Sequence, residues 1–281
     1  MPISIHNRLC DICQSSTHLV HLPHYSLDEW EMVECLNCQY TFLANPPPYQ
    51  ELETTFAWEK TSQQSTSQRH SSTPIQAVVA QSSKKLRRSL FKRRKIRDLA
   101  IAHMPEQPGT IVDIGCMKGD TLIRFCKELR ENHFNPTPIG IEISTELAQR
   151  ADKKLKKIGG RCIHADALSA LSSIAPSCSG LVIMSAYLEH EYQALAVLKQ
   201  VSRVLKSDGI AVIKVPNFAS WNRHIMGKRW CGFRYPDHVN YFTPKTLMKL
   251  CSQADLQSVR FSWRDRFPTS DNMYAVVAKA P

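Results

Sequence analysis

Apolar and polar positions along the chain alternate between two periods, one typical of buried strands and one typical of helices. Residues 111–123 begin as an apolar strand, pass through a glycine-bearing turn and open a helix. Apolar runs at residues 138–143 and 180–185 and a shorter one at 161–167 predict further strands. This alternation predicts an α/β protein, in which strands and helices follow one another along the chain.

The second half of the chain continues the same alternation. One helix is predicted from the spacing of six apolar residues: Ala194, Val197, Leu198, Val201, Val204 and Leu205. A glycine turn at residues 207–209 then leads into a strand that extends to Asn217. Thr243 is a favourable N-cap before Pro244, so we expect a helix from Pro244 to Ala254. Two strands are predicted after it, at Leu256–Trp263 and Met273–Ala278.

The turn after the first strand has the composition of a nucleotide cradle. Gly115 and Gly119 allow the backbone to turn sharply and approach a ligand, and Asp113 at the strand end can accept hydrogen bonds. A dinucleotide fingerprint requires glycine at its first, third and sixth positions, which here are Gly115, Met117 and Asp120. Because the last two positions fail this requirement, the sequence argues against NAD.

Read as Asp-x-Gly-x-Gly-x-Gly, the turn matches at Asp113, Gly115 and Gly119 and departs only at Met117. In this form it resembles motif I of class I S-adenosylmethionine-dependent methyltransferases. The Leu-Glu-His sequence at residues 188–190 and the helix and strand that follow it also resemble that family. The stretch Pro-Asp-His-Val-Asn-Tyr-Phe-Thr at residues 236–243 is similar to a subfamily with an N-terminal zinc ribbon. The resemblance covers about residues 95–281.

The resemblance implies a Rossmann-like doubly wound sheet of seven strands with an antiparallel last strand. It also implies that Glu142 binds the ribose hydroxyls of S-adenosylmethionine and that Asp166 lies near the adenine amine. The predicted cofactor-binding residues are Asp113, Gly115, Cys116, Gly119, Glu142, Asp166 and Ser185. Cys116 is interpreted as a small packing residue of the turn and not as a nucleophile. Ala186 stands where many relatives have a histidine, which removes a polar group from the mouth of the site.

Two histidines are the candidate catalytic residues. Methyl transfer to an oxygen with a high pKa benefits from a general base, and histidine commonly has this role. His190 follows the predicted fourth strand, and His238 lies in a predicted acceptor lid at about residues 216–243. The lid also contains Trp221, Trp230, Phe233 and Tyr235, which form either an aromatic acceptor pocket or the core of the lid; their place in the chain favours a pocket.

We therefore expect a methyltransferase that acts on a hydroxyl group of a small-molecule or glycan acceptor. An alternative is an RNA methyltransferase, because a basic segment suits phosphates. Against it, the Asn-Pro-Pro-Tyr motif of amine methylation is missing after the fourth strand. A second alternative is a non-catalytic binding module, which the acidic residues Asp113, Glu142 and Asp166 argue against.

The N-terminal region contains two Cys-x-x-Cys pairs, Cys10 with Cys13 and Cys35 with Cys38, separated by 21 residues. Such pairs present two thiolates each to one tetrahedral zinc ion, and four sulfur ligands leave no position for water, so the zinc would be structural. Redox dithiols are the alternative, and one of the histidines at 18, 21 and 24 could replace a cysteine ligand. We assign residues 1–48 to this zinc ribbon, which is too small to fold without its metal.

Between the ribbon and the methyltransferase region, residues 49–83 are predicted to be a flexible linker rich in serine, threonine and glutamine. The region from residue 84 to 281 then opens with Lys84–Arg97, in which nine of fourteen residues are basic and none is acidic. The net charge of the chain is +11, so these nine account for all but +2 of it. The run either binds an anionic partner, such as RNA, a phospholipid surface or a phosphorylated carrier, or forms a solvated helix.

Composition sets the remaining expectations. With 281 residues and 43% apolar composition, the chain can form one large domain with a small appendage. The first residues contain no apolar run of signal length, and no stretch of about 18 apolar residues predicts a membrane span. We therefore expect a soluble, cytoplasmic protein, in which the ten cysteines are reduced thiols and metal ligands and not disulfides.

Overall fold

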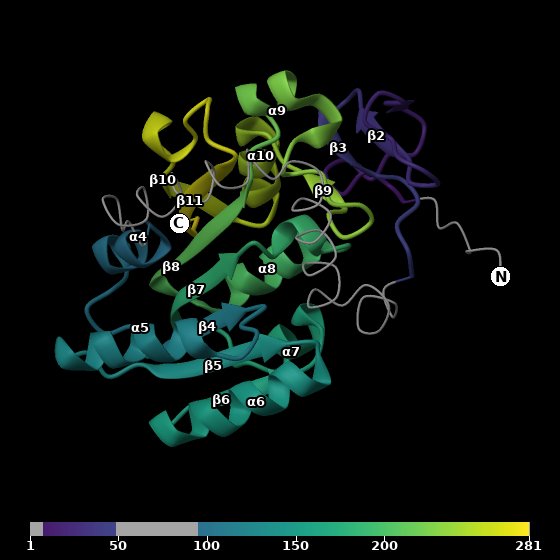
Figure 1. The fold of residues 1–281 in the computed structure, drawn as a ribbon. Coiled ribbons are helices and arrows are strands. Elements are labelled where there is room, and N and C mark those ends of the chain that lie inside the picture. Colours follow the sequence, from purple (N-terminus) through teal and green to yellow (C-terminus); the bar gives the residue numbers. More distant parts are fainter. Residues whose placement is uncertain (1–7, 49–94, 281) are drawn as a thin grey trace, which may run out of the picture.

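The computed structural model describes residues 8–48 and 95–280, and its largest element is a sheet of seven strands (Figure 1). The strand order is β10-β11-β8-β7-β4-β5-β6. The strands are β4 (Thr110–Ile114), β5 (Thr137–Glu142), β6 (Arg161–His164), β7 (Ser179–Ser185), β8 (Leu205–Pro216), β10 (Leu256–Arg260) and β11 (Asn272–Lys279). β4 to β8 are parallel, whereas β11 is antiparallel to both of its neighbours. The predicted Rossmann-like sheet with an antiparallel last strand is thus confirmed.

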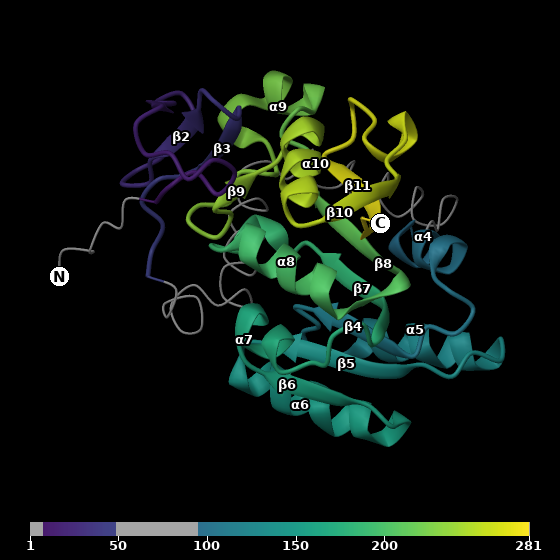
Figure 2. The same ribbon diagram turned by 180° about the vertical axis from the view of Figure 1, so that it is seen from behind.

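Helices cover both faces of this sheet (Figures 1 and 2). The helices are α4 (Lys95–His103), α5 (Asp120–Glu131), α6 (Thr145–Leu155), α7 (Ala167–Ser172), α8 (Ala194–Val204) and α10 (Pro244–Gln253). Apolar residues of α4, α5 and α6 share one buried cluster with Ile111, while those of α7, α8 and α10 share another with Val112. Because neighbouring residues of a strand point to opposite faces, the two clusters are the two faces of one sheet.

Several short helices lie in the connections between these strands and helices. They are the 3-10 turns η1 (Lys156–Ile158), η2 (Leu188–His190), η3 (Gly227–Arg229) and η4 (Trp263–Asp265) and the α-helix α9 (Trp221–Met226). Among the described residues, no helix combines the length and the apolar character that a bilayer crossing requires.

The predicted boundary between α8 and β8 differs from the structure. The strand expected after the glycine turn begins before it, because Leu205 already pairs with Ser179. Leu181 pairs with Ile210, so the predicted turn is an irregularity inside β8. At Gly209 a Cβ atom would lie 2.6 Å from the Ser179 carbonyl oxygen, which explains how the two strands approach so closely there.

The predicted start of α10 is confirmed. The Thr243 side chain accepts a hydrogen bond from the backbone N–H of Thr246, and the Thr246 hydroxyl accepts one from the backbone N–H of Thr243. This reciprocal arrangement satisfies two backbone donors at the helix end, and such caps contribute about 1 kcal/mol. It fixes the chain direction immediately after the segment that contains His238.

The N-terminal region forms a second sheet that the main domain completes. The strands β1 (Leu19–His21), β2 (Met32–Cys35) and β3 (Tyr40–Leu43) are antiparallel, and β9 (Asn240–Tyr241) pairs with β3. β9 lies two residues after His238 in the chain. The N-terminal strands therefore hold the segment that carries one of the candidate catalytic residues.

An apolar cluster fills the space beneath this second sheet. Trp30, Met32 and Leu43 come from the N-terminal region, and Phe218, Trp230, Phe233, Val239 and Tyr241 come from residues 216–243. The two parts therefore form one packed unit. The predicted linker at 49–83 and residues 84–94 of the basic run lie outside the described residues, and α4 begins with the last three residues of that run, Lys95–Arg97.

Candidate functional site

The turn between β4 and α5 is held against the end of β5. Its Gly115 and Cys116 N–H groups both donate to the Ile141 carbonyl, at 2.9 and 3.1 Å. Gly115 and Gly119 have φ angles of 71° and 73°, so both occupy the left-handed region that glycine tolerates best. Gly119 is the N-cap of α5, and the turn thus places backbone donors at the start of this helix.

Met117 occupies the middle position of the turn, where the resembled motif has glycine. Its φ angle is 54°, which costs an ordinary L-residue about 1–2 kcal/mol. The backbone N–H of Met117 donates to Glu142 Oε2 at 2.8 Å, and the second oxygen of Glu142 accepts from the Ser144 N–H at 3.0 Å. Glu142 therefore supports the strained turn in addition to its predicted contact with a ribose.

Asp113 lies at the end of β4, directly beneath the turn, and is buried. Burial, together with the negative charge of Glu142, raises the pKa of Asp113 to about 7. The two carboxylates thus lie at the carboxyl ends of adjacent parallel strands, β4 and β5, as the sequence predicted.

A cavity of about 530 Å³ opens beside the turn, within the size range of small-molecule sites. Four of the predicted cofactor-binding residues contribute to its wall: Asp113, Gly115, Cys116 and Ser185. Gly119, Glu142 and Asp166 are not part of the wall. Lys214 of β8 and Tyr274 of β11 also line the cavity, and no sequence motif identified them.

Met117 also lines the cavity, but it was not among the predicted residues. The wall therefore combines the turn after β4 with the carboxyl end of β7, which are adjacent because β4 and β7 pair in parallel.

Asp166 lies beyond β6 and caps α7. Its carboxylate accepts from the Ser169 N–H at 2.8 Å, and although partial burial raises its pKa, the hydrogen bonds from Ser169 lower it overall. It therefore remains charged at neutral pH. The Cys116 thiol contacts a second thiol, because its Sγ atom lies 3.8 Å from Sγ of Cys162. This contact agrees with its interpretation as a packing residue.

The two candidate catalytic histidines lie next to each other. Their ring centroids are 4.7 Å apart and their planes are nearly perpendicular. His190 Nδ1 lies 2.8 Å from the Asp237 carbonyl oxygen, and His238 Nδ1 lies 2.8 Å from that of Gly232. A carbonyl oxygen only accepts, so each Nδ1–H donates, and each neutral ring keeps its Nε2 lone pair available.

The environments of the two rings push their pKa values apart. Burial lowers the pKa of His190, but Asp237 more than offsets this effect and raises it overall; Asp237 Oδ1 lies 3.6 Å from the ring nitrogen. Burial, and then the charge of His190, lower the pKa of His238 well below its usual value. His238 is therefore neutral near pH 7, while His190 is the histidine of the pair that binds a proton more readily.

Glu189 completes this cluster, and the sequence analysis did not select it. Ligand atoms of Glu189, His190 and His238 all lie within 4.8 Å of one another, a grouping that could hold a metal ion. The Glu189 side chain is buried, which raises its pKa, and its Oε2 atom has no hydrogen-bond partner in the part of the chain that the structure describes. Its position beside His190 in the Leu-Glu-His sequence was the signal that could have identified it.

The aromatic residues of the predicted lid have different environments. Trp230 and Phe233 are buried in the cluster beneath the second sheet, and Tyr235 packs against it. Trp221, by contrast, is 60% exposed. The expectation that these residues form an acceptor pocket is therefore wrong: three of them are the core of the lid, because Trp30 and Met32 of the N-terminal region cover them.

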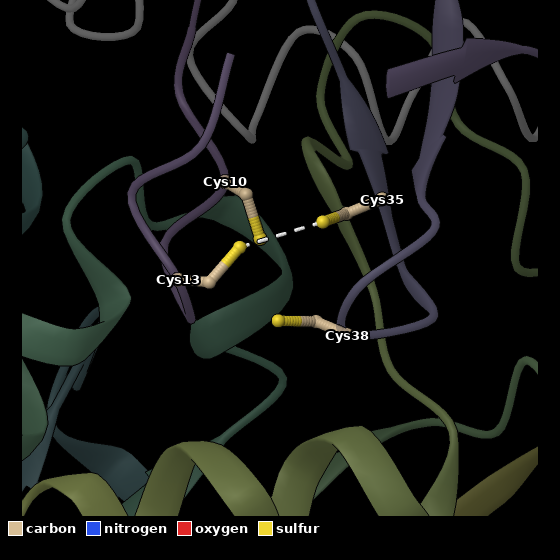
Figure 3. Close-up of side chains that lie close together, drawn as sticks. All are labelled: Cys10, Cys13, Cys35 and Cys38. Carbon is tan, nitrogen blue, oxygen red and sulfur yellow. Dashed lines mark hydrogen bonds between the residues drawn. The ribbon is translucent and has the colours of Figure 1, made fainter. Parts of the chain in front are cut away.

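The four cysteines of the N-terminal pairs converge as predicted (Figure 3). All four sulfur atoms lie within 4.8 Å of one another, and those of Cys13 and Cys35 are 3.5 Å apart. Four sulfurs bound to one zinc ion would lie roughly 3.8 Å apart, given Zn–S bonds of about 2.3 Å. Lys249 of α10 contacts Cys38 through its Nζ atom at 3.6 Å, so the main domain also reaches this cluster.

Comparisons with known proteins agree with this geometry. The family model described as "Methyltransferase domain" matches residues 84–260. A S-adenosylmethionine-dependent methyltransferase from Clostridium acetobutylicum has a similar structure, with a TM-score of 0.52, 12% identity and coverage of 72% of this chain and 100% of that one. A putative S-adenosylmethionine-dependent methyltransferase from Listeria monocytogenes gives a TM-score of 0.50, 17% identity and coverages of 66% and 98%. No curated protein sequence matches this chain significantly.

Proposed function

The chain belongs to the methyltransferase-domain family whose model matches residues 84–260, and on this premise we propose that it methylates a hydroxyl group of a small-molecule or glycan acceptor with S-adenosylmethionine. The observation that carries the proposal is the position of the histidine pair. His190 follows the carboxyl end of β7, and Ser185 at that end lines the cavity beside the glycine turn. A base and a cofactor cradle thus occur at one edge of the sheet.

The glycine turn and its acidic neighbours are proposed to hold the cofactor. Gly115 and Gly119 allow close approach of the backbone, and Asp113 and Ser185 supply polar groups in the cavity wall. Glu142 and Asp166 are assigned to the ribose and the adenine amine, as the resemblance implies, while Cys116 packs behind the turn. When bound, S-adenosylmethionine would supply an activated methyl group, because its sulfonium sulfur is a good leaving group.

The protein's contribution to this reaction is mainly alignment and removal of one proton. Such a displacement needs the acceptor oxygen to be placed in line, and little covalent chemistry is required. His190 or His238 takes the hydroxyl proton at Nε2, since in each ring Nδ1 already donates to a backbone carbonyl. Asp237 orients His190 and keeps its pKa high enough for this step.

We further propose that Cys10, Cys13, Cys35 and Cys38 hold one structural zinc ion. Four thiolates would complete its tetrahedral coordination, so the ion would have no position for a substrate. Residues 1–48 would then form the zinc ribbon and residues 216–243 the acceptor lid. The pairing of β3 with β9 gives the ribbon a mechanical role, because it supports the segment next to His238.

Calorimetry with S-adenosylmethionine, followed by methyl-transfer assays on candidate acceptors, tests the proposal. Binding of S-adenosylmethionine and transfer of its methyl group to a hydroxyl would support it. Transfer to an amine or a carbon atom would refute the proposed acceptor class but leave the cofactor assignment intact. Binding of NAD in place of S-adenosylmethionine would refute the cofactor assignment.

A further inference from the structure

Five large apolar side chains lie exposed in two segments of the C-terminal half, and we call them the aromatic patch. They are Trp221, Ile225, Met226, Trp263 and Phe267. Ile225 is 78% exposed, and Trp221 and Trp263 are each 60% exposed. Exposed side chains of this size cost free energy in water, and grouped on one surface they indicate a binding site.

The two segments of the patch are joined by hydrogen bonds. The Trp221 N–H donates to the Pro268 carbonyl at 2.8 Å, and the Asn222 side chain donates to the Thr269 carbonyl at 2.9 Å. The rings of Trp263 and Phe267 are 5.4 Å apart. Both views of the ribbon place α9 and the segment before β11 at the same end of the molecule (Figures 1 and 2). The five side chains therefore belong to one region of the surface.

Charges around the patch are of one sign. Residues 221–231 and 261–272 contain the exposed cations Lys228, Arg229, Arg264 and Arg266. Their only two acidic residues face inward: Asp265 is buried beside Lys95 and Arg260, and Asp271 accepts hydrogen bonds from Trp230 and Asn222. The region thus combines exposed apolar groups with exposed positive charge. This combination is complementary to a surface whose negative charges lie next to an apolar layer.

The last three residues of the basic run, Lys95–Arg97, begin α4 next to this region. Residues 84–94 contain seven basic residues in the sequence, and the chain continues at Lys95, whose Nζ atom donates to the Arg264 carbonyl at 3.0 Å. Positive charge close to a bilayer strengthens binding when the lipids are anionic. We propose that the aromatic patch binds the surface of an anionic phospholipid membrane.

The side chains of the patch favour lipid over nucleic acid. Tryptophan rings suit the level of the lipid headgroups, and the aliphatic Ile225 and Met226 can enter the acyl boundary, where they gain burial. Nucleic acid would use the aromatic rings for stacking but gains little from aliphatic side chains. Trp221, Ile225 and Met226 lie within the proposed lid, yet the proposal does not depend on which acceptor the enzyme uses.

Vesicle flotation with the full chain tests the proposal. The protein should bind vesicles of phosphatidylcholine with phosphatidylglycerol at least about tenfold more tightly than phosphatidylcholine alone, and added salt should weaken the binding. The triple variant Trp221→Ser, Ile225→Ser, Trp263→Ser should lose at least about tenfold in binding. A matched triple variant, Val20→Ser, Leu27→Ser, Ile101→Ser, changes exposed apolar residues elsewhere and should bind normally.

A second measurement does not depend on the stability of the triple variant. In the unsubstituted protein, phospholipids brominated near the headgroup should quench tryptophan fluorescence, and Trp221→Phe or Trp263→Phe should reduce the quenching. Equal vesicle binding by the two triple variants would overturn the proposal. So would a patch-dependent loss of binding to poly(U) or to another protein without a loss of vesicle binding, because the patch would then serve that partner instead.

Discussion

The backbone N–H of Met117 donates to the Glu142 carboxylate at 2.8 Å, which links the strained position of the turn to the end of the neighbouring strand. Met117 stands where the family motif has glycine, and it has the φ angle that glycine would adopt there. A carboxylate that accepts backbone hydrogen bonds can offset part of this strain, because hydrogen bonds to charged groups contribute about 1.5–3 kcal/mol. The departure from the motif therefore leaves the shape of the turn intact.

The strain at Met117 predicts an unusual order of stabilities. Met117→Gly should be more stable than Met117→Ala by about 1 kcal/mol, because alanine would pay the cost of positive φ and glycine would not. In α4, an ordinary helix, Ala102→Gly should instead destabilise the protein by about 1 kcal/mol. Urea unfolding of the three variants measures both differences. A Met117→Ala variant more stable than Met117→Gly would show that this position is not strained.

The raised pKa of Asp113 predicts a dependence of stability on pH. Its pKa of about 7 in the folded state lies above the value of about 3.9 for an unfolded chain, so stability is greatest below pH 4 for this group and falls as pH rises through 7. Between low pH and pH well above 7, the contribution of Asp113 to the free energy of unfolding changes by on the order of 4 kcal/mol. Comparing the melting temperatures of the unsubstituted protein and Asp113→Asn across this range isolates the effect, since the other titratable groups contribute equally in both proteins. Parallel curves for the two proteins would contradict it.

Cofactor affinity should depend on the acidic residues at the strand ends. We expect Asp113→Ala and Glu142→Ala to weaken S-adenosylmethionine binding by about 1–3 kcal/mol, the usual cost of losing a hydrogen bond to a charged group. Because Glu142 also supports Met117, its variant should lose stability as well. Calorimetry and thermal unfolding measure the two effects separately. Asp152→Asn, at an acidic residue of α6 that pairs with Lys156 on the helix surface, is the control and should bind the cofactor normally.

Methyl transfer should depend on the histidine pair. Replacement of the general base, His190 or His238, by alanine should lower turnover by about 10²–10⁴-fold while cofactor affinity stays unchanged. If His190 is the base, the rate rises with pH through its raised pKa, and Asp237→Asn should move this acidic limb to lower pH, because Asp237 raises that pKa. Rate profiles across pH check the shift. Near-normal turnover in both alanine variants would mean that alignment alone drives the reaction.

The cysteine cluster should bind about one zinc ion per chain, as its four converging sulfurs indicate. Elemental analysis of the purified protein measures this content, and serine substitutions at Cys10, Cys13, Cys35 and Cys38 should abolish it. Loss of the metal should impair methyl transfer more than cofactor binding, because β3 supports β9 and not the glycine turn. Unchanged zinc content in the serine variants would disprove the assignment.

The sequence by itself determined the elements whose signals are local. The glycine turn at Gly115 and Gly119, the cap at Thr243 and the two cysteine pairs each depend on residues close together in the chain, so their chemistry is readable without a fold. The alternation of strands and helices likewise predicted an α/β fold, while the seven-stranded sheet was an implication of the family resemblance. The cofactor-binding roles expected for Glu142 and Asp166 also come from that resemblance and stay predictions.

Only the tertiary structure decided the relationships between distant residues. The pairing of β3 with β9, the contact between His190 and His238 and the burial of Trp230 beneath Trp30 all join segments that are far apart in the chain. The same applies to Glu189, because only the fold shows that its buried carboxylate lies close to the rings of His190 and His238. Side-chain burial follows from which surfaces meet, and periodicity within a single segment does not contain that information.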